Sequence, residues 1–289
     1  MEFFIQLVIN GLMLGMVYAL IAIGLSLIFG VLEIVNFAHG HFYMLGATVL
    51  AALVTSAGIG FFPGLVIATV AVGVVGYLVY VVLLRHFREG EFDRGIILTI
   101  GIGMVLQNGV AYLFGSSSRM VDTSLSFVSW DVAGFFVDAQ RAVAVLVGAV
   151  AIAALYAVLT FTRIGKAMRA FAQNREAAFI VGIRPAVIAG IAVAIGIALA
   201  GLAGAALAPV FAVHPAMGAP ILFKVFAIII IGGLGSLPGA LVASLLIGVT
   251  ESVVGGYSSV ALQDAVAFML MIVVLLAFPA GLFGKGIRV

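Results

Sequence analysis

The chain has 289 residues, of which 65% are apolar and only 8% are charged, and its mean hydropathy is +1.38. Soluble domains have roughly 45–50% apolar and about 25% charged residues, so this composition excludes a soluble globular protein. The small net charge of +2 argues against nucleic acid as a partner, and the absence of cysteine excludes disulfides, thiolate metal sites and cysteine nucleophiles.

The apolar runs predict an all-α integral membrane protein, a polytopic bundle of about eight transmembrane elements of about 20 residues each. The first run has no basic region before it and is too long for a signal peptide, so we expect it to remain as a span. We expect residues 1–289 to form a single transmembrane domain. In chain order, the expected spans are 4–30, 40–57, 62–84, 95–115, 141–162, 185–212, an interrupted region at 223–254, and 265–283.

Lysine and arginine are concentrated in three connections, with three in 85–95, five in 163–184 and two in the tail after 283. The connection 116–140 contains only Arg119, together with three aspartates. Short basic loops stay in the cytoplasm, so the sequence predicts a cytoplasmic C-terminus and an N-terminus on the other side. This orientation requires the interrupted region to enter and leave the membrane on the same side.

The interruption itself predicts a broken or re-entrant helix. Nine apolar residues, FKVFAIIII (223–231), are followed by the glycine- and proline-containing GGLGSLPGA (232–240). Nine helical residues reach only about 14 Å, roughly half of the hydrocarbon core, and glycine and proline break helices. A single kinked span is the alternative. Non-helical backbone at membrane depth requires surrounding protein or a water-filled cavity.

A second interruption lies in the first half, where FGVLEIVNFAHGHFYMLG (29–46) places glycines and polar residues in an apolar region. Interrupted segments in both halves of a chain indicate the substrate pathway in transporters built from repeats, and polar residues in spans usually face a cavity or the bundle interior. We therefore assign to the substrate pathway Asn36, His39, Thr99, Gln107 and Asn108, with Gly232, Gly233, Gly235 and Pro238 of the other interruption.

Several of these polar residues also have a structural interpretation. Gln107 and Asn108 point about 100° apart on a helix, so one can line a pathway while the other bonds between helices, and interhelical hydrogen bonding is favoured for the pair. His39 and His41 lack further metal ligands, which favours packing or a backbone hydrogen bond over a metal site. For Lys224, snorkelling at the outer edge is favoured over a role in the pathway.

The sequence also lacks several chemistries. There is no G-x-x-x-x-G-K-[ST] motif, so the chain has no P-loop of its own for ATP. No expected span carries Asp or Glu near its middle, where a proton- or sodium-driven carrier would couple. No Ser-His-Asp set or H-E-x-x-H motif indicates a hydrolase, so we expect neither enzyme activity nor a bound cofactor. An energy source, if one is used, must come from another subunit.

The segment 163–184 is the expected docking site for such a subunit. It carries five Lys or Arg and one acid, Glu176, between two long apolar runs. Its apolar residues fall roughly at helical spacing, which predicts a helical element at the cytoplasmic surface with one face offered to a partner. The alternative is a basic loop that only fixes the topology. The apolar residues in question are Met168, Phe171, Ala172, Phe179, Ile180 and Ile183.

Four stretches together resemble the permeases of high-affinity branched-chain amino acid ABC transporters, of the LivH type. They are GLSLIFGVLEIVNFAHGHFYMLGA (24–47), GKAMRAFAQNREAAFIVGI (165–183), FKVFAIIIIGGLGSLPGALVASLLIGVTE (223–251) and FPAGLFGK (278–285). The resemblance implies a permease of the bacterial inner membrane with a periplasmic N-terminus. It implies as partners a sister permease, two cytoplasmic ABC ATPases that bind the ATP, and a periplasmic substrate-binding protein, besides membrane lipid.

Glu176, Ala177, Ala178 and Gly182 also match the start of the E-A-A-x-x-x-G signature of importer permeases, although the later apolar and proline positions of that signature are absent. In those permeases a short cytoplasmic helix sits in a groove of the ATPase, and the glycine permits the turn after it. The resemblance therefore implies ATPase coupling through Lys166, Arg169, Asn174, Arg175, Glu176, Ala177, Ala178 and Gly182.

The substrate and two other classes of function stay open at this point. Similar permeases carry urea, short amides or other small solutes instead of branched-chain amino acids. A stand-alone carrier or channel for a small neutral solute would keep transporting after ATP depletion. A scaffold subunit without a pathway would tolerate substitution of Thr99, Gln107 or Asn108 without any change in transport.

Overall fold

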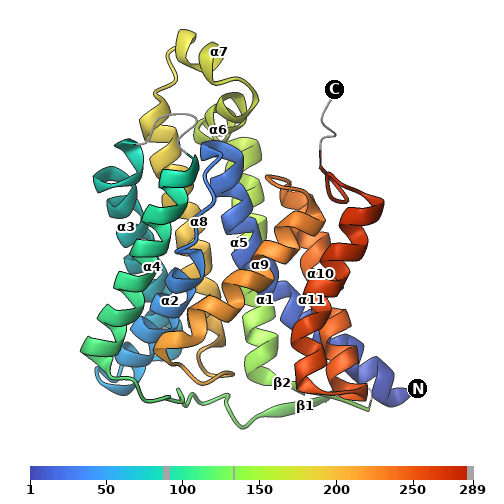
Figure 1. Ribbon diagram of the computed structural model, residues 1–289. Helices are drawn as coiled ribbons and strands as arrows, with labels where there is room; N and C mark the ends of the chain where they lie inside the picture. The colour runs from blue at the N-terminus through green and yellow to red at the C-terminus, as the bar shows by residue number, and fades with distance from the viewer. Residues whose placement is uncertain (87–91, 133, 285–289) are drawn as a thin grey trace.

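The computed structural model describes residues 1–86, 92–132 and 134–284, and this part of the chain is mostly helical, as predicted (Figure 1). Two short strands, β1 (Ser129–Val132) and β2 (Phe135–Asp138), form an antiparallel hairpin. The helices are α1 (Glu2–Leu32), α2 (His39–Thr55), α3 (Phe61–Val82), α4 (Phe92–Phe114), α5 (Ala139–Phe161), α6 (Arg163–Gln173), α7 (Arg175–Ile180), α8 (Pro185–Leu207), α9 (Gly218–Gly232), α10 (Leu237–Tyr257) and α11 (Val260–Ala277), with short 3-10 turns at Leu84–His86 and Pro215–Met217.

Seven helical segments of the described chain are long and apolar enough to cross a membrane, and α11 supplies a shorter apolar helix. α1 has 31 residues and measures about 46 Å at 1.5 Å per residue, more than a hydrocarbon core of about 30 Å. It lies inclined in the bundle, as a span of this length requires (Figure 1). The composition thus leads to the expected polytopic membrane fold.

The bundle has two distinct ends (Figure 1). The β end carries the β1–β2 hairpin and the N-terminus, and the α6 end carries α6, α7 and the segment that follows α11. In the basic connection 85–95, Arg85 and Arg94 belong to the described residues, in the 3-10 turn after α3 and in the first turn of α4. The basic residues of the tail after 283 lie outside the described residues, so the distribution of basic residues can be followed in the structure through Arg85, Arg94 and the segment 163–184.

The interrupted region forms a helical hairpin instead of one kinked span. α9 starts at the β end and runs toward the α6 end. Residues 233–236 reverse the chain there, and α10 returns to the β end (Figure 1). The region therefore enters and leaves on one side, as predicted. The predicted start at residue 223 is wrong, because α9 already begins at Gly218, so its 15 residues reach about 22 Å.

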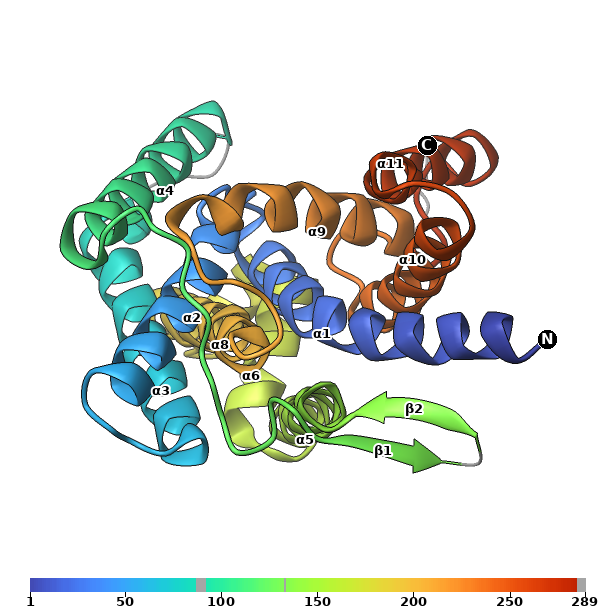
Figure 2. The same cartoon turned by 90° about the horizontal axis from the view of Figure 1, so that it is seen from below.

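Small residues let the central helices approach closely. A Cβ added at Gly196 of α8 would lie 2.5 Å from the backbone oxygen of Gly24 in α1. A Cβ at Gly204 would collide with the backbone oxygen of Tyr43 in α2. In a membrane, apolar helices gain little hydrophobic free energy by packing against each other, because lipid is equally apolar. Close backbone contact is therefore a main source of helix association. α1, α2 and α8 form a tightly packed centre around which the other helices are arranged (Figure 2).

Candidate functional site

The basic segment 163–184 folds into two short helices, α6 and α7, and not into one continuous element. Asn174 separates them with an extended backbone (φ −157°, ψ 109°), and its Oδ1 accepts a hydrogen bond of 2.9 Å from the backbone N–H of Ala177. Thr162 caps α6 in the same way, accepting from Gly165 N at 3.0 Å. Asn and Thr are favourable at these positions because their oxygens satisfy the free N–H groups of a first helical turn.

Gly182 ends α7 in a left-handed conformation, with φ of 84°. Its N–H bonds to the carbonyl of Phe179 at 3.0 Å, and the N–H of Ile183 bonds to the carbonyl of Ala178 at 3.0 Å. Glycine adopts this conformation without the steric cost that a Cβ brings. The local turn is therefore the one that the signature resemblance implies, whereas its role in coupling stays a prediction.

The two helices expose different surfaces. In α6, Met168 and Phe171 are buried while Lys166 and Arg169 are exposed, which fits the predicted amphipathic pattern. In α7, the apolar residues do not continue the buried face of α6, because Phe179 and Ile180 are 69% and 82% exposed. The break at Asn174 rotates α7 away from the phase of α6. Val181 is also 74% exposed, so the tip of α7 is an apolar knob, defined here as Phe179–Val181.

Arg175 holds α7 onto the end of α1. Its Nη2 donates to the backbone oxygen of Val31 at 3.0 Å and lies 3.8 Å from Oε1 of Glu33, and its guanidinium lies 5.4 Å from the centre of the Phe171 ring. Glu176 and Ala177 of the predicted coupling set are exposed, whereas Ala178 is buried. The set is thus divided: Arg175 and Ala178 attach α7 to its own chain, and the rest of α7 faces outward.

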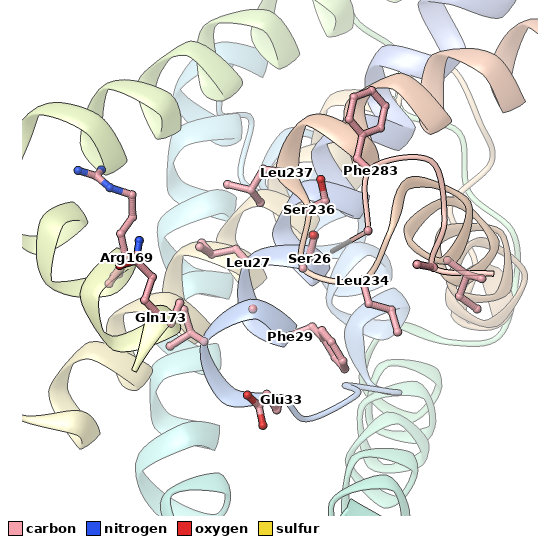
Figure 3. Close-up of a pocket in the computed structure, with 18 of the residues that line it drawn as sticks. Ser26, Leu27, Phe29, Glu33, Arg169, Gln173, Leu234, Ser236, Leu237 and Phe283 are labelled. Atoms are coloured by element: carbon pink, nitrogen blue, oxygen red, sulfur yellow. The ribbon is translucent and has the colours of Figure 1, made fainter. Parts of the chain in front are cut away.

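A cavity of about 930 Å³ lies between α6, the end of α1, the turn of the α9–α10 hairpin and the segment after α11. Figure 3 shows Arg169 and Gln173 of α6 on one side of it and Leu234 and Ser236 of the hairpin turn on another. The predicted coupling segment and the predicted pathway interruption therefore share one space. Of the predicted pathway residues, Gly235 lines this cavity.

The hairpin turn is built by the glycines that the sequence singled out. Gly233 and Gly235 have φ of 98° and 78°, and Ser236 caps α10 by accepting from Gly239 N at 3.2 Å, with Pro238 in the first turn. The free carbonyls at the end of α9 are bound from another element. Leu282 N donates to Ile231 O at 2.7 Å, and Phe283 N donates to Gly232 O at 3.1 Å. These two hydrogen bonds satisfy backbone carbonyl groups that the break in the helix would otherwise leave without donors inside the membrane.

The predicted pathway residues of the first half mostly stabilise the link between α1 and α2. Asn36 is buried, and its Oδ1 accepts from Ala38 N at 3.0 Å. Thr99 of α4 is buried and accepts from Phe37 N at 3.2 Å. His39 is buried, with Nε2 3.0 Å from the backbone oxygen of Ile21. The backbone hydrogen bond favoured for His39 is present.

Gln107 and Asn108 separate as their spacing indicated. Oε1 of Gln107 lies 3.3 Å from Nε2 of His41, which is the interhelical bond that was favoured. Asn108 is exposed, and its side chain bonds only to the Met104 carbonyl in its own helix, at 2.8 Å. Asn108 therefore lies on the outer surface of this chain, not in its interior.

A charged cluster escaped the sequence analysis. Lys224 of α9 lies 3.2 Å from Glu251 of α10 and 3.0 Å from Asp264 of α11, and the Tyr18 hydroxyl of α1 donates to Glu251 at 2.9 Å. Glu251 is completely buried, toward the β end of α10 and not near the middle of the span, and Lys224 is paired instead of snorkelling. A signal was present: between residues 185 and 284 these three are the only Lys, Arg, Asp or Glu.

The fold and this site define a multi-pass membrane permease in which the basic segment 163–184 lies at the α6 end, beside a broken helix. The chain belongs to the family of branched-chain amino acid transport system permease components, which it matches over residues 7–275. It is 33% identical to the high-affinity branched-chain amino acid transport system permease protein LivH of Escherichia coli, covering 98% of this chain and 96% of the relative.

Two further relatives widen the range of organisms. BraD of Pseudomonas aeruginosa, a high-affinity branched-chain amino acid transport system permease protein, is 31% identical over 98% of this chain and 96% of the relative. A probable branched-chain amino acid transport permease protein LivH of Methanocaldococcus jannaschii is 29% identical over 92% and 88%. No solved structure matches the chain significantly. The predicted family is confirmed, and its relatives are transport permeases and not enzymes.

Proposed function

We propose that this chain is the transmembrane permease subunit of an ATP-driven importer of branched-chain amino acids, with residues 1–289 as a single permease domain. It forms the translocation pathway with a second permease, two cytoplasmic ABC ATPases bind and hydrolyse ATP, and a periplasmic binding protein delivers substrate. The α6 end faces the cytoplasm and the β end the periplasm of the inner membrane. The names of the relatives support the substrate class.

The observation that carries the ATPase partner is the apolar knob, Phe179–Val181. Three adjacent apolar side chains, all at least 69% exposed, stand at the end of the bundle outside the long apolar helices. Arg175 and the Gly182 turn fix the short helix that presents them. A helical knob of this kind fits an apolar groove on a partner, and the exposed Lys166 and Arg169 supply a polar rim.

The cavity suggests how the coupling segment acts on the pathway. Closure of the ATPases on ATP displaces α7. The movement reaches α6 because Asn174 joins the two helices directly and Arg175 of α7 stacks on Phe171 of α6. α6 carries Arg169 and Gln173 in the cavity wall, opposite Gly235 and Ser236 of the hairpin turn. Movement of α6 therefore changes the space beside the interruption. In this mechanism the cavity is part of the cytoplasmic exit, which closes when the pathway opens to the binding protein.

The test is uptake of radiolabelled leucine into proteoliposomes that contain the permease pair and the ATPases, with the loaded binding protein on the outer side. ATP-dependent leucine accumulation is the expected result. Uptake that continues without ATP would favour a stand-alone carrier, and ATP-driven uptake of urea or acetamide in place of leucine would overturn the substrate class. Recovery of the chain without ATPases under gentle detergent extraction would contradict the partner.

A further inference from the structure

A second cavity lies at the β end of the bundle, and the coupling mechanism above does not use it. Its volume is about 220 Å³. Since a water molecule occupies about 30 Å³ of the liquid, this is the space of about seven waters or of one amino acid. Its walls come from α1, the start of α5, the end of α8 and the loop after it, the end of α10 and the start of α11.

Arg141 is the charged residue in the wall of this small cavity, and it forms no ion pair with any described residue. It is half-buried in the first turn of α5, where the partial positive charge of the helix end makes a cation unfavourable. The neighbouring Asp138 caps α5 by accepting from the backbone N–H of Arg141 at 2.8 Å, and not from its guanidinium. The stability of α5 therefore does not explain this arginine. A half-buried guanidinium without a counter-ion attracts an anionic group.

Two amide side chains lie in the same cavity, Asn10 of α1 and Gln263 of α11. Asn10 Oδ1 accepts from Gln6 Nε2 at 3.2 Å, which leaves the NH2 group of Asn10 as a donor. The amide of Gln263 makes no hydrogen bond within the described part of the chain. A Cβ added at Gly255 would lie 2.6 Å from Oε1 of Gln263, so the glycine provides the space that this amide occupies. The cavity thus offers hydrogen bonds that the fold itself does not use.

The rest of the wall is mostly apolar. Met13 and Val17 of α1 and Phe211 after α8 are among its residues. Ligand pockets typically combine an apolar lining with a few polar groups that fix the orientation of the ligand. One cation, two amides and an apolar wall match a small molecule with a carboxylate at one end and an aliphatic chain at the other.

The position of this cavity also points to the pathway. α1, α5, α10 and α11 line it at the β end, and the same four helices line the large cavity at the α6 end. Between the two cavities the helices pack closely, since a Cβ at Gly15 would lie 2.8 Å from Cα of Leu245 and one at Gly148 would lie 3.3 Å from Met16. Two separate spaces at opposite ends of one group of helices are the arrangement expected of a route that opens to one side at a time.

From this geometry we infer that the small cavity binds the amino-acid substrate on the periplasmic side, with the α-carboxylate on Arg141 and the branched side chain against the apolar wall. This inference rests on the proposed function and names the site that receives substrate from the binding protein. A guanidinium and a carboxylate form two parallel hydrogen bonds, and Oε1 of Gln263 can accept from the ammonium group. Urea and short amides have no carboxylate and gain no charged contact here.

The first experiment measures binding of radiolabelled leucine to the purified permease–ATPase complex in lipid nanodiscs, without ATP and without binding protein. The competitor 2-hydroxy-4-methylpentanoate keeps the carboxylate and the branched chain, so it is expected to displace leucine. Leucinamide lacks the carboxylate and is expected not to. Arg141→Gln is expected to raise the Kd for leucine about 10- to 100-fold. Arg141→Lys should recover part of the loss, because it keeps the charge without the planar fork.

A control and a stability measurement separate recognition from a structural role. Arg119→Gln changes another arginine near the β end, whose guanidinium bonds to the Phe114 carbonyl outside this cavity, and should leave the Kd unchanged. Without leucine, Arg141→Gln should be at least as stable as the parent, because a cation is unfavourable at that helix end. Leucine should raise the Tm of the parent and not that of Arg141→Gln.

The second experiment uses the natural absence of cysteine in the chain. In right-side-out vesicles, Gln263→Cys is expected to react with a membrane-impermeant thiol reagent added outside. Leucine at ten times the Kd measured for this variant should slow the reaction about tenfold, since it occupies about nine-tenths of the sites. Phe136→Cys, at a 67% exposed position of the β1–β2 hairpin, should react at the same rate with and without leucine.

Competition by leucinamide as strong as that by the hydroxy acid would overturn the inference, and so would a leucine-free Tm of Arg141→Gln well below that of the parent. If Arg141→Gln weakens the complex with the binding protein and leaves the Kd for leucine unchanged, Arg141 contacts that protein and the inference is wrong. If ATP-driven leucine uptake is intact but the complex alone binds no leucine, only this inference fails. If the complex takes up no leucine at all, the proposed substrate fails instead.

Discussion

Replacing Lys224 by methionine tests whether the charged cluster is one energetic unit. Glu251 is completely buried and has Lys224 as its cationic partner at 3.2 Å, with Tyr18 as its hydrogen-bond donor. Lys224→Met removes the cation and leaves the carboxylate buried with the tyrosine hydroxyl alone. Removing one partner of a buried ion pair typically costs about 3–5 kcal/mol, because the remaining charge stays desolvated.

For a chain of this size, that cost corresponds to a fall in Tm of roughly 6–10 °C. The double variant Lys224→Met/Glu251→Gln contains no buried charge, and the glutamine oxygen can still accept from Tyr18. Its deficit is expected to shrink to about 1 kcal/mol, which is a lost charged hydrogen bond rather than an unpaired charge. Tm is measured on the detergent-purified protein by intrinsic fluorescence, with Lys166→Met on the exposed face of α6 as a control.

The reasoning would be refuted if the double variant were as unstable as Lys224→Met, since the second substitution then would not relieve an unpaired carboxylate. A loss below about 1 kcal/mol in Lys224→Met would also contradict it, because it would show that water already reaches Glu251. A shift of similar size in Lys166→Met would mean that charge removal acts on the detergent complex and not on the cluster.

Three further substitutions test other parts of the molecule. Gly182→Val forces a β-branched residue to φ of 84°, so leucine uptake should fall at least tenfold while membrane insertion, followed by fractionation, is unchanged; normal uptake would argue against coupling through this turn. Phe179→Asp places a charge on the apolar knob, so the ATPases should no longer co-purify with the permease, while its Tm should stay within about 2 °C of the parent. If the ATPases still co-purified, α7 would not be part of the interface. Gly204→Leu drives a side chain into the Tyr43 carbonyl, so little folded protein should be recovered by size-exclusion chromatography, in contrast to Gly109→Leu, where a Cβ meets nothing within 4 Å.

The large-scale features were accessible from sequence because they follow from composition. Apolar runs of span length fix the helices, and glycine with proline at 232–240 fixes the break, since these residues act through local backbone geometry. The turn at Gly182 is local for the same reason. The confirmed family likewise rested on such local motifs.

The charged cluster was not predicted because it depends on contacts between distant residues. Lys224, Glu251 and Asp264 are far apart in the chain, and only the packing of α9, α10 and α11 brings them together. The apolar residues Phe179 and Ile180 were placed on one face with Met168 because the break at Asn174 changes the helical phase between them. The interruption at 29–46 and the polarity of Asn36, His39 and Thr99 predict a pathway. In the fold these side chains bond backbone groups near 35–38 and in α1, and their part in a pathway stays a prediction.

The hairpin of α9 and α10 adds an even number of passages to the chain. Because it starts and finishes at the β end, neither its length nor the depth of its turn affects the side on which α11 begins. Insertion signals carried by basic residues elsewhere can therefore set the topology without constraining this element. The turn can therefore lie at the depth that suits the space beside it, while every other helix keeps its direction across the membrane.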